Sequence, residues 1–421
     1  MKIAIIGSGG REHAICQKIN ESKKVKKIFC IPGNGGTKKI AENIKINLKN
    51  FKEIKSFLLR ENIDLTIIGP EEPLVNGIVN FLRKYKLKVF GPDRYCSRLE
   101  GSKIFTKKIC KKENIPTANF KIFKDIKSSI KYVRNTNYPL VVKADGLAAG
   151  KGVFICRSFN DAKRAISKIF NGSFGRSKEI LIENFLHGEE MSFFIIYDNK
   201  TFKFFNTAQD HKRVFEGDNG PNTGGMGAYS PSRLHNKTLE KKIIDRIILP
   251  TLNYLKKRKA VYVGFLYAGL MIKENDPYLI EYNVRMGDPE CQTILPLLKN
   301  DFLEIIENCT KGKLNKTKIK WKNKKSVCVV LTSKGYPNKY KKNIVIKNLK
   351  MIKNKNNQYI FHAGTKLVDG KFYSYGGRVL NFVSTHINFI SARKNSLKLI
   401  KILNWRNGFY RSDIGFKVID R

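Results

Sequence analysis

Apolar residues in the first hundred positions form short buried runs that are separated by helical segments. The runs end at glycine or proline and are "KIAIIG" (2–7), "KIFCIPG" (27–33), "IDLTIIGP" (63–70) and "LKVFGP" (87–92). The segment "EHAICQKIN" (12–20) has the spacing of an amphipathic helix. Alternating strands and helices are typical of a doubly wound parallel sheet. We therefore predict an α/β protein in which residues 1–101 form a Rossmann-like domain.

The pattern changes after residue 101. Residues 102–114 and 237–257 have helical spacing, and glycine-rich segments separate several apolar strands between them. After a lysine-rich linker, further strands are predicted in "SVCVVLTSKGYP" (326–337), "FHAGTKL" (361–367) and "GGRVLNFVS" (376–384). We predict a central domain over 102–325 and a small mixed α/β domain over 326–421.

The charge of the chain is extreme, with a formal net charge of +46. A nucleic-acid-binding protein is one interpretation, because lysines facing phosphates provide most of such affinity. However, the lysines are spread along the whole chain together with Asn and Ile, and we recognise no nucleic-acid-binding motif. We expect no specific nucleic-acid partner. A steep salt dependence of DNA binding would favour the alternative.

Apolar runs and cysteines indicate the compartment. No run approaches the roughly 18 residues of a membrane span, and the N-terminal run is too short for a signal peptide. The eight cysteines contain no C-x-x-C pair, and the six histidines are scattered. We expect reduced thiols in a cytoplasmic protein, with no membrane partner and no zinc or histidine metal site.

The stretch "PLVVKADGLAAGKGVFIC" (139–156) places Lys143 at the end of an apolar run, before a glycine-rich loop. It is not a Walker A loop, because only three residues separate Gly146 from Gly150, and Gly152 stands where Ser or Thr would bind magnesium. An apolar strand also follows it. We predict a flap of strand, loop and strand that closes over a polyphosphate, with Lys143 reaching the phosphates. A purely structural hairpin would explain the glycines but not the lysine.

A second glycine-rich turn, "GSGGREH" (7–13), follows the first predicted strand. Gly7 and Gly9 match the start of G-x-G-x-x-G, but Glu12 occupies the third position. With Arg11 at a helix N-terminus, the turn suits a single phosphate better than a dinucleotide. A tight strand–helix turn without a ligand is the alternative.

Polar residues downstream supply what a phosphate flap requires. In "ILIENFLHGEE" (180–190), the strand runs into Glu183 and on to Leu186, where a nucleotide base could pair with backbone, and Glu190 could bind ribose hydroxyls. In "YLIEYNVR" (278–285), Glu281 and Asn283 are two residues apart and share one face of a strand. Oxygen ligands of this kind suit Mg²⁺ that bridges phosphates.

These features together resemble the ATP-grasp superfamily and, within it, the phosphoribosylamine–glycine ligase family. The resemblance extends over essentially the whole chain. It rests on the motifs "GSGGREHA" (7–14), "PGNGGT" (32–37), "DLTIIGPEEPLV" (64–75), "EGSKIFTK" (100–107), "VKADGLAAGKGV" (142–153), "AQDHKRVFEGDNGPNTGGMGAYSP" (208–231), "GFLYAGLM" (264–271), "EYNVRMGDPE" (281–290), "FHAGTK" (361–366) and "GGRVL" (376–380). Glu72 and Met286 stand where the family usually has a small residue and Phe. Another ATP-grasp ligase or a biotin carboxylase relative is the alternative, and the long segment 208–231 argues against it.

The resemblance implies a reaction. ATP, glycine and 5-phosphoribosylamine would give glycinamide ribonucleotide, ADP and phosphate through glycyl phosphate, in the second step of purine biosynthesis. It also implies Mg²⁺ or Mn²⁺ as the metal, held by Glu281 and Asn283. We further expect a monomer and a mobile subdomain over about 116–190, which would exclude water from the acyl phosphate.

The resemblance also assigns the other site residues. The residues expected to bind ATP are Lys103, Lys143, Gly146, Gly150, Lys151, Gly152, Glu183, Phe185, Leu186 and Glu190. Arg285 would orient the glycine carboxylate or steady the acyl phosphate, and Asp210 would help to bind the glycine ammonium or the metal. Backbone donors near glycine are expected from Gly224, Gly225 and Met226. The phosphoribosyl group would face Gly9, Gly10 and Arg11, together with the loop after Pro70.

Overall fold

The computed structural model describes residues 1–147, 152–173, 179–352 and 356–419. Its N-terminal part is a five-stranded parallel sheet in the order β3-β2-β1-β4-β5. The first strand lies between two apolar neighbours, with Ile3 opposite both Ile28 and Leu65, and its residues 3–7 are buried because helices cover the sheet. The doubly wound α/β prediction is confirmed. The elements are β1 (Lys2–Gly7), α1 (Gly10–Asn20), β2 (Lys27–Pro32), η1 (Thr37–Lys39), β3 (Glu42–Asn43), α2 (Phe51–Arg60), β4 (Leu65–Ile68), α3 (Glu71–Val75), α4 (Ile78–Arg83) and β5 (Val89–Phe90).

Two short helices lead from this sheet into an antiparallel four-stranded subdomain, which has the strand order β6-β9-β7-β8. Strands β7 and β8 pair antiparallel, with Lys143 opposite Val153, so the predicted strand–loop–strand unit is confirmed for the described residues. Two helices pack against this sheet through an apolar cluster that includes Val142 and Ile166. The elements are α5 (Arg94–Gly101), α6 (Lys103–Lys112), β6 (Phe120–Phe123), α7 (Ile126–Arg134), β7 (Leu140–Ala144), β8 (Val153–Cys156), α8 (Phe159–Phe170) and β9 (Ile180–Asn184).

The largest sheet is shared by the centre and the C-terminal part of the chain. Its strands follow the order β16-β15-β10-β11-β14-β17-β22-β19, and β23 pairs with β17. Ala228 in β14 lies opposite Cys328 in β17, so the C-terminal strands continue the central sheet. The predicted helix over 237–257 is present as two α-helices joined by one π-helical turn.

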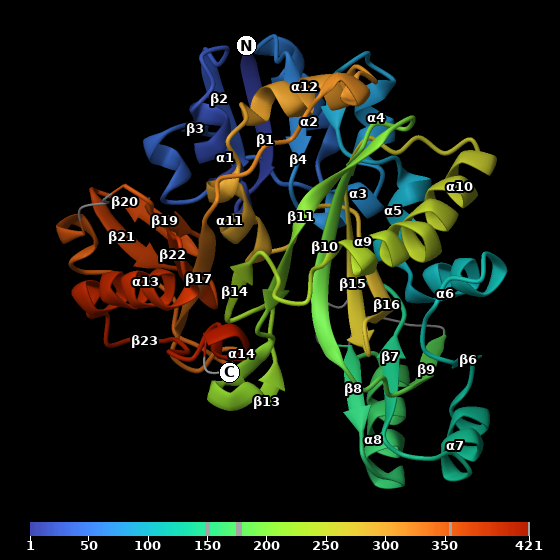
Figure 1. Ribbon diagram of the computed structural model, residues 1–421. Helices are drawn as coiled ribbons and strands as arrows, with labels where there is room; N and C mark the ends of the chain where they lie inside the picture. Colours follow the sequence, from blue (N-terminus) through green and yellow to red (C-terminus); the bar gives the residue numbers. More distant parts are fainter. Residues whose placement is uncertain (148–151, 174–178, 353–355, 420–421) are drawn as a thin grey trace.

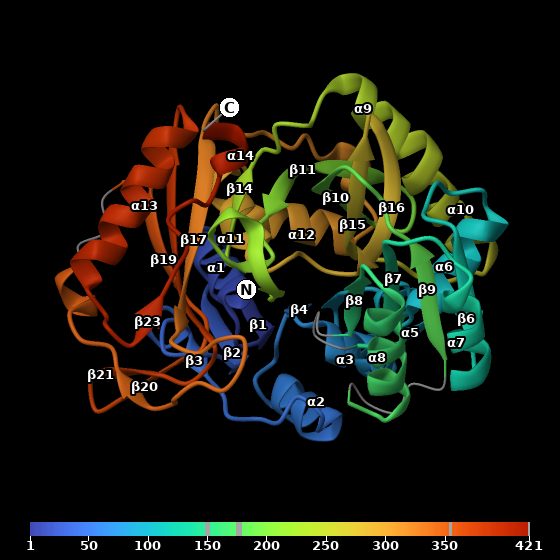
Figure 2. The ribbon, with the colours of Figure 1, turned by 90° about the horizontal axis from the view of Figure 1, so that it is seen from below.

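The bounds of these central elements are β10 (Glu189–Tyr197), β11 (Phe202–Asp210), β12 (Arg213–Phe215), η2 (Glu216–Asp218), β13 (Asn219–Asn222), β14 (Gly227–Ser230), α9 (Lys237–Ile243), η3 (Ile244–Ile248), α10 (Leu249–Lys257), β15 (Gly264–Lys273), β16 (Asp276–Asn283), α11 (Glu290–Ile294), η4 (Leu295–Leu297), α12 (Phe302–Thr310) and η5 (Leu314–Lys316). The C-terminal elements are β17 (Lys325–Ser333), β18 (Ile344–Val345), η6 (Leu349–Met351), β19 (Gln358–His362), β20 (Thr365–Val368), β21 (Lys371–Ser374), β22 (Arg378–His386), α13 (Phe389–Leu403), β23 (Gly408–Phe409) and α14 (Phe416–Ile419). The C-terminal part and the antiparallel subdomain lie on opposite sides of the molecule (Figures 1 and 2).

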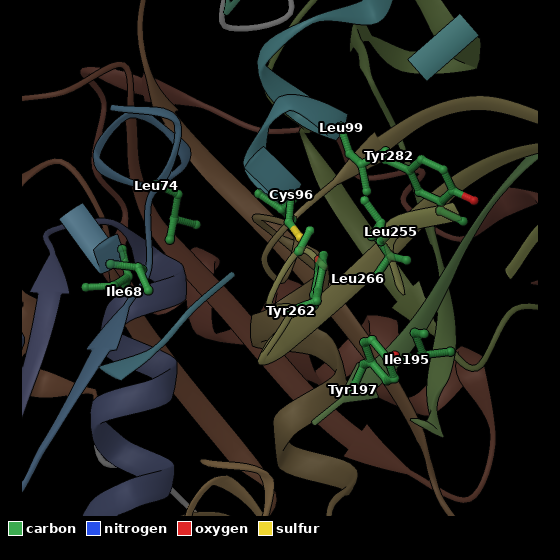
Figure 3. Packing of buried hydrophobic residues seen from close by; sticks show 14 of the residues in the cluster. Ile68, Leu74, Cys96, Leu99, Ile195, Tyr197, Leu255, Tyr262, Leu266 and Tyr282 are labelled. Carbon is green, nitrogen blue, oxygen red and sulfur yellow. The ribbon is translucent and has the colours of Figure 1, made fainter. Parts of the chain in front are cut away.

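One continuous apolar core connects the N-terminal sheet to the central sheet (Figure 3). Leu74 and Leu99 from the N-terminal side and Tyr262 and Leu266 from the central side are almost completely buried in it. Burial of this kind contributes about 25 cal/mol per Å² of apolar surface. All eight cysteines are free and buried. Among the described residues, no helix has both the length and the apolar character needed to cross a membrane.

Candidate active site

A cavity of about 420 Å³ opens where the antiparallel subdomain, the central sheet and the N-terminal sheet meet. Its walls come from segments far apart in the chain, and they include Arg11 after β1, Lys143 on β7, Glu281 on β16 and Arg378 on β22. The cavity therefore exists only in the assembled fold.

Three lysines and one glutamate form the wall on the side of the antiparallel subdomain. Glu183 is 5% exposed, and its two carboxylate oxygens lie 2.7 Å from Lys143 Nζ and 3.1 Å from Lys107 Nζ. Lys143 and Glu183 are diagonal neighbours on one face, because β7 pairs antiparallel with β9. The third lysine, Lys103, donates a hydrogen bond to the carbonyl oxygen of Gly146 at 3.0 Å. We call Lys103, Lys107, Lys143 and Glu183 the lysine wall.

The lysine wall carries more cations than its carboxylate can pair. Burial by itself would raise the pKa of Glu183, but Lys143 and Lys107 outweigh burial and the pKa is lowered. Burial lowers the pKa values of Lys103 and Lys107, which shows the cost of keeping these ammonium groups out of water. A bound polyanion would relieve that cost.

The carboxylate and amide predicted to bind metal lie on the central sheet and line the same cavity. Glu281 is on β16, and Asn283 ends that strand. Burial opposes ionisation of Glu281, but Lys212 and Lys143 outweigh burial and lower its pKa, so its carboxylate is charged. Among the described residues, no three Asp, Glu, His or Cys side chains gather into a complete metal site. A carboxylate and an amide oxygen in a cavity lined by lysines instead suit Mg²⁺ or Mn²⁺ bound together with a polyphosphate.

Arginines and carboxylates are paired on the wall nearest the N-terminal sheet. Arg285 Nη2 lies 2.5 Å from Glu100 Oε1, and Arg285 Nε lies 3.3 Å from Glu71 Oε2. Arg11 Nε lies 2.6 Å from Glu12 Oε1, and Arg11 and Arg285 both donate to the carbonyl oxygen of Met286 at 3.2 Å. We call Arg11, Arg285 and their carboxylate partners the arginine wall.

Two carboxyls of the arginine wall differ strongly in acidity. Arg285 lowers the pKa of Glu71 to about 2, whereas burial raises the pKa of Glu100 to about 7 although Arg285 acts against burial. Glu100 also accepts a hydrogen bond from the Val284 N–H at 2.9 Å. These bonds fix the guanidinium of Arg285 at the cavity surface.

The glycine-rich segment meets the cavity at Gly224 and packs behind it at Gly225. Gly225 has φ +106°, and a Cβ there would lie 2.6 Å from Asp210 Oδ1 and from Pro289 Cδ. Asp210 Oδ1 is buried and accepts no hydrogen bond from the described residues. Burial and then Glu290 raise the pKa of Asp210. A bound cation would restore its charge.

The structure brings together most of the predicted site residues. Those that line the cavity are Arg11, Lys103, Lys143, Gly146, Glu183, Phe185, Leu186, Glu190, Asp210, Gly224, Glu281, Asn283 and Arg285. Gly150 and Lys151 lie outside the described residues. Glu183 faces lysines with its side chain, and Glu190 pairs with Lys212 at 2.7 Å.

Five predicted residues do not line the cavity in the described part of the chain: Gly9, Gly10, Gly152, Gly225 and Met226. Met226 is fully buried in the C-terminal apolar core, which argues against a side-chain contact with substrate. Gly9 and Gly10 support the site from behind, since a Cβ on Gly10 would lie 2.4 Å from the Asn381 side chain. The substrate contacts of these residues stay predictions.

Several cavity residues were not predicted individually as site residues from the sequence. They are Glu71, Glu100, Lys107, Lys212, Asp288, Glu290 and Arg378. Lys107 lies one helical turn after Lys103, and this i, i+4 spacing on a predicted helix was an available signal. Arg378 offered none, because its contact with Asp288 at 3.4 Å joins β22 to a distant loop.

The cavity lies between a small antiparallel subdomain and a large sheet. Lysines line one side of it, and a carboxylate and an amide line the other. This arrangement defines an ATP-grasp protein. Family models give a finer result. The ATP-grasp, N and C domains of phosphoribosylglycinamide synthetase match residues 101–291, 1–100 and 326–417, respectively. The chain belongs to this family, the phosphoribosylamine–glycine ligases.

Individual relatives agree with that membership. Phosphoribosylamine–glycine ligases from Caldanaerobacter subterraneus and Brucella melitensis are 44% and 42% identical to this chain, over 98% and 100% of it and 99% of each relative. The crystal structure of the ligase from Thermotoga maritima superposes with a TM-score of 0.85 at 33% identity, covering 98% of this chain and all of that one. The biotin carboxylase domain of a Hydrogenobacter thermophilus carboxylase has a TM-score of 0.72 at 17% identity, over 95% of this chain and 89% of that one, which shows a shared fold only.

Proposed function

We propose that this protein joins glycine to 5-phosphoribosylamine at the expense of ATP, giving glycinamide ribonucleotide, ADP and phosphate in purine biosynthesis. The observation that carries the proposal is one cavity with an excess of buried lysines on one side and Glu281, Asn283 and Arg285 on the other. Family membership specifies the substrates. The free and buried cysteines support action in the cytoplasm.

In the first step, a carboxylate oxygen of glycine attacks the γ-phosphorus of ATP, and the bond to the β–γ bridging oxygen breaks. Glycyl phosphate and ADP result. Lys103 and Lys143 would neutralise charge on the transferring group, and Arg285 would orient the attacking carboxylate. The unpaired oxygen of Asp210 is an acceptor for the glycine ammonium.

In the second step, the amine nitrogen of 5-phosphoribosylamine attacks the acyl carbon. The bond from that carbon to the phosphate oxygen breaks, phosphate leaves, and the amine gives up a proton. Arg11, which lines the cavity beside Glu71, would hold the phosphoribosyl group. The acyl phosphate would hydrolyse in water, so closure of the segment around Gly146 over the cavity fits the chemistry.

Mg²⁺ or Mn²⁺ would be held by Glu281 and Asn283 and would neutralise charge on the phosphates of ATP when bound. The chain's own part is to present two oxygen ligands on one strand end. Charged lysines around Glu281 keep that carboxylate ionised.

Phosphate release tests the proposal. Purified protein with ATP and Mg²⁺ should release phosphate rapidly only when glycine and 5-phosphoribosylamine are both present. We also expect a strong preference for glycine over L-alanine, because the backbone that lines the cavity at Gly224 is held from behind by the close packing of Gly225 on Asp210 and Pro289 and would resist an extra methyl group. If phosphate release did not depend on 5-phosphoribosylamine, or if glycine and alanine gave equal rates, the protein would be an ATP-grasp ligase of another specificity.

A further inference from the structure

Five cavity residues come from one stretch that runs from the end of β11 to β14, and residues 411–417 hold that stretch in place. We call residues 210–225 the acceptor loop. The members of the acceptor loop that line the cavity are Asp210, Lys212, Asn222, Thr223 and Gly224. The loop contains a two-stranded ribbon, β12 and β13, in which Arg213 lies opposite Asn222. We call residues 411–417 the C-terminal segment, and α14 begins within it, beside the ribbon (Figure 1).

Arg411 makes the central contact between the two stretches. Its side chain is 1% exposed, and its Nη1 donates to Asp218 Oδ1 at 2.8 Å and to the Arg213 carbonyl oxygen at 3.0 Å. Its Nε and Nη2 donate to the two oxygens of Asp413, each at 2.8 Å. A buried guanidinium with this many directed bonds fixes its partners strongly, because losing any bond leaves charge unpaired in the interior.

Further bonds join the C-terminal segment to the ribbon. The Gly217 N–H donates to Asp413 Oδ2 at 2.9 Å, and Lys417 Nζ lies 2.7 Å from Asp218 Oδ2. The Ser412 N–H and hydroxyl both donate to Glu216 Oε1, at 2.9 and 2.5 Å. The first strand of the ribbon and the turn that follows it are thus held by residues nearly two hundred positions away.

A third connection reaches the root of the acceptor loop. The Gly415 N–H donates to His211 Nε2 at 3.1 Å. Burial and then Arg411 lower the pKa of His211 to about 4, so its ring is neutral and can accept this bond. His211 lies between Asp210 and Lys212, and its carbonyl oxygen accepts from the Met226 N–H at 2.8 Å. A displacement of the C-terminal segment would therefore also displace the backbone at both ends of the acceptor loop.

We propose that the C-terminal segment, through Arg411, positions the acceptor loop for the amino-acid substrate, and that Arg411 is a positioning residue for the ligase reaction. This inference rests on the proposed function for the identity of the substrate. The lysine wall receives no contact from this segment in the described residues, whereas Lys212 of the acceptor loop pairs with Glu190 at 2.7 Å, so ATP binding should depend on the segment less than glycine binding does.

The test is steady-state kinetics of Arg411→Ala with each substrate varied. We expect KM for glycine to rise about tenfold or more, because small misplacements of positioning groups are costly, whereas KM for ATP should rise clearly less than KM for glycine. Arg164→Ala is the matched control, since Arg164 forms an exposed pair with Asp161 at 2.6 Å on α8. It should leave both KM values as in the wild type. Unchanged KM for glycine in Arg411→Ala would overturn the proposal.

A second variant separates positioning from stability. Arg411→Met combined with Asp218→Asn and Asp413→Asn removes the cation without leaving buried charges unpaired, so stability should recover relative to Arg411→Ala. If Arg411 positions the loop, KM for glycine stays high in this triple variant, and Arg411→Lys gives only partial rescue because lysine cannot form the fork of bonds. Recovery of KM for glycine together with thermal stability in the triple variant would overturn positioning.

Hydrogen exchange provides a readout that needs no activity. Amides of residues 213–222 should exchange faster in Arg411→Ala than in the wild type, while those of β7 and β9 should not change. Unchanged protection of the ribbon would overturn the inference. Failure of wild-type protein to release phosphate with glycine would overturn the proposed function instead, and the exchange result would stand independently of it.

Discussion

The lysine wall and the arginine wall both bury charge, but they balance it differently. On the lysine wall, Lys107 and Lys143 share the carboxylate of Glu183, and Lys103 donates a hydrogen bond to a carbonyl oxygen, with no ion pair to a carboxylate among the described residues. On the arginine wall, Arg285 has two carboxylate partners and Arg11 has Glu12. An unbalanced cluster lowers its electrostatic cost when a polyanion binds. A balanced network holds its groups in fixed positions whether or not a ligand is present. From this contrast we infer that the lysine wall would bind phosphates and that the arginine wall would orient the acceptor.

Removal of Lys143 is expected to have the largest effect. Lys143→Ala should lower kcat by about 10²–10³, the loss typical of one preorganised group at a site of developing charge. Stopped assays of phosphate release would measure it. Lys163→Ala, an exposed lysine on α8 of the same subdomain, is the control and should turn over normally. If Lys143→Ala kept kcat and ATP affinity near the wild-type values, Lys143 would have a structural role and no role in catalysis.

Glu281→Gln tests the proposed metal ligands of the cavity. The variant should fold normally and need about tenfold or more Mg²⁺ for half-maximal rate, because Mg²⁺ gives up its water reluctantly without a charged ligand. The measurement is a Mg²⁺ titration at saturating substrates. Asp276→Asn, on the same strand but paired with Lys242 at the surface, should titrate as the wild type does. If Glu281→Gln and the wild type needed the same Mg²⁺ concentration for half-maximal rate, Glu281 would not be a metal ligand.

Gly225→Ala tests the acceptor side. The new Cβ would press on Asp210 and Pro289 from a residue at φ +106°, so we expect about a tenfold loss in kcat/KM for glycine with KM for ATP unaffected. Gly370→Ala is matched, since Gly370 also has positive φ (+69°) but has no atom within 4 Å of the added Cβ. If both variants lost kcat/KM for glycine equally, backbone strain alone would explain the effect of Gly225→Ala.

The smallest expected effect on turnover concerns the packing behind the arginine wall. Burial lowers the pKa of His13 to about 3, and its Nδ1 accepts a hydrogen bond from the His362 N–H at 2.8 Å. The unfolded chain therefore binds more protons than the native state between about pH 6.5 and pH 3, so stability is lost as pH falls through that range. From pH 7 to pH 5, His13 alone should remove about 2 kcal/mol of unfolding free energy.

Urea unfolding at both pH values measures this loss. His13→Gln keeps an acceptor but cannot be protonated, so it should reduce the loss and leave kcat at pH 7 near the wild-type value. His386→Gln, at a half-buried position, should retain the full loss. If His13→Gln lost as much stability as the wild type, protonation of His13 would not be part of acid unfolding.

The sequence by itself determined the local chemistry of this protein. The apolar runs predicted the parallel sheet, and the charge at the end of "PLVVK" with the following glycines predicted a cation beside a phosphate flap. The two-residue spacing of Glu281 and Asn283 placed them on one face of a strand, and both line the cavity. The predictions of the sheet and of the shared face are confirmed because backbone periodicity depends on residues only a few positions apart, whereas the role of the flap toward phosphates stays a prediction.

Only the tertiary structure decided which of these groups meet. Lys143 stood alone in the sequence, but its charge is paired with Glu183 forty residues later, and Glu100 reaches Arg285 across 185 positions. Arg411 at the end of the chain holds Asp218, and Met226 turns into the core although its neighbour Gly224 lines the cavity. The hydrophobic periodicity of the sequence indicates which face of each helix or strand is buried. The contacts between faces follow from packing of the whole chain, in which charges are buried where distant partners satisfy them.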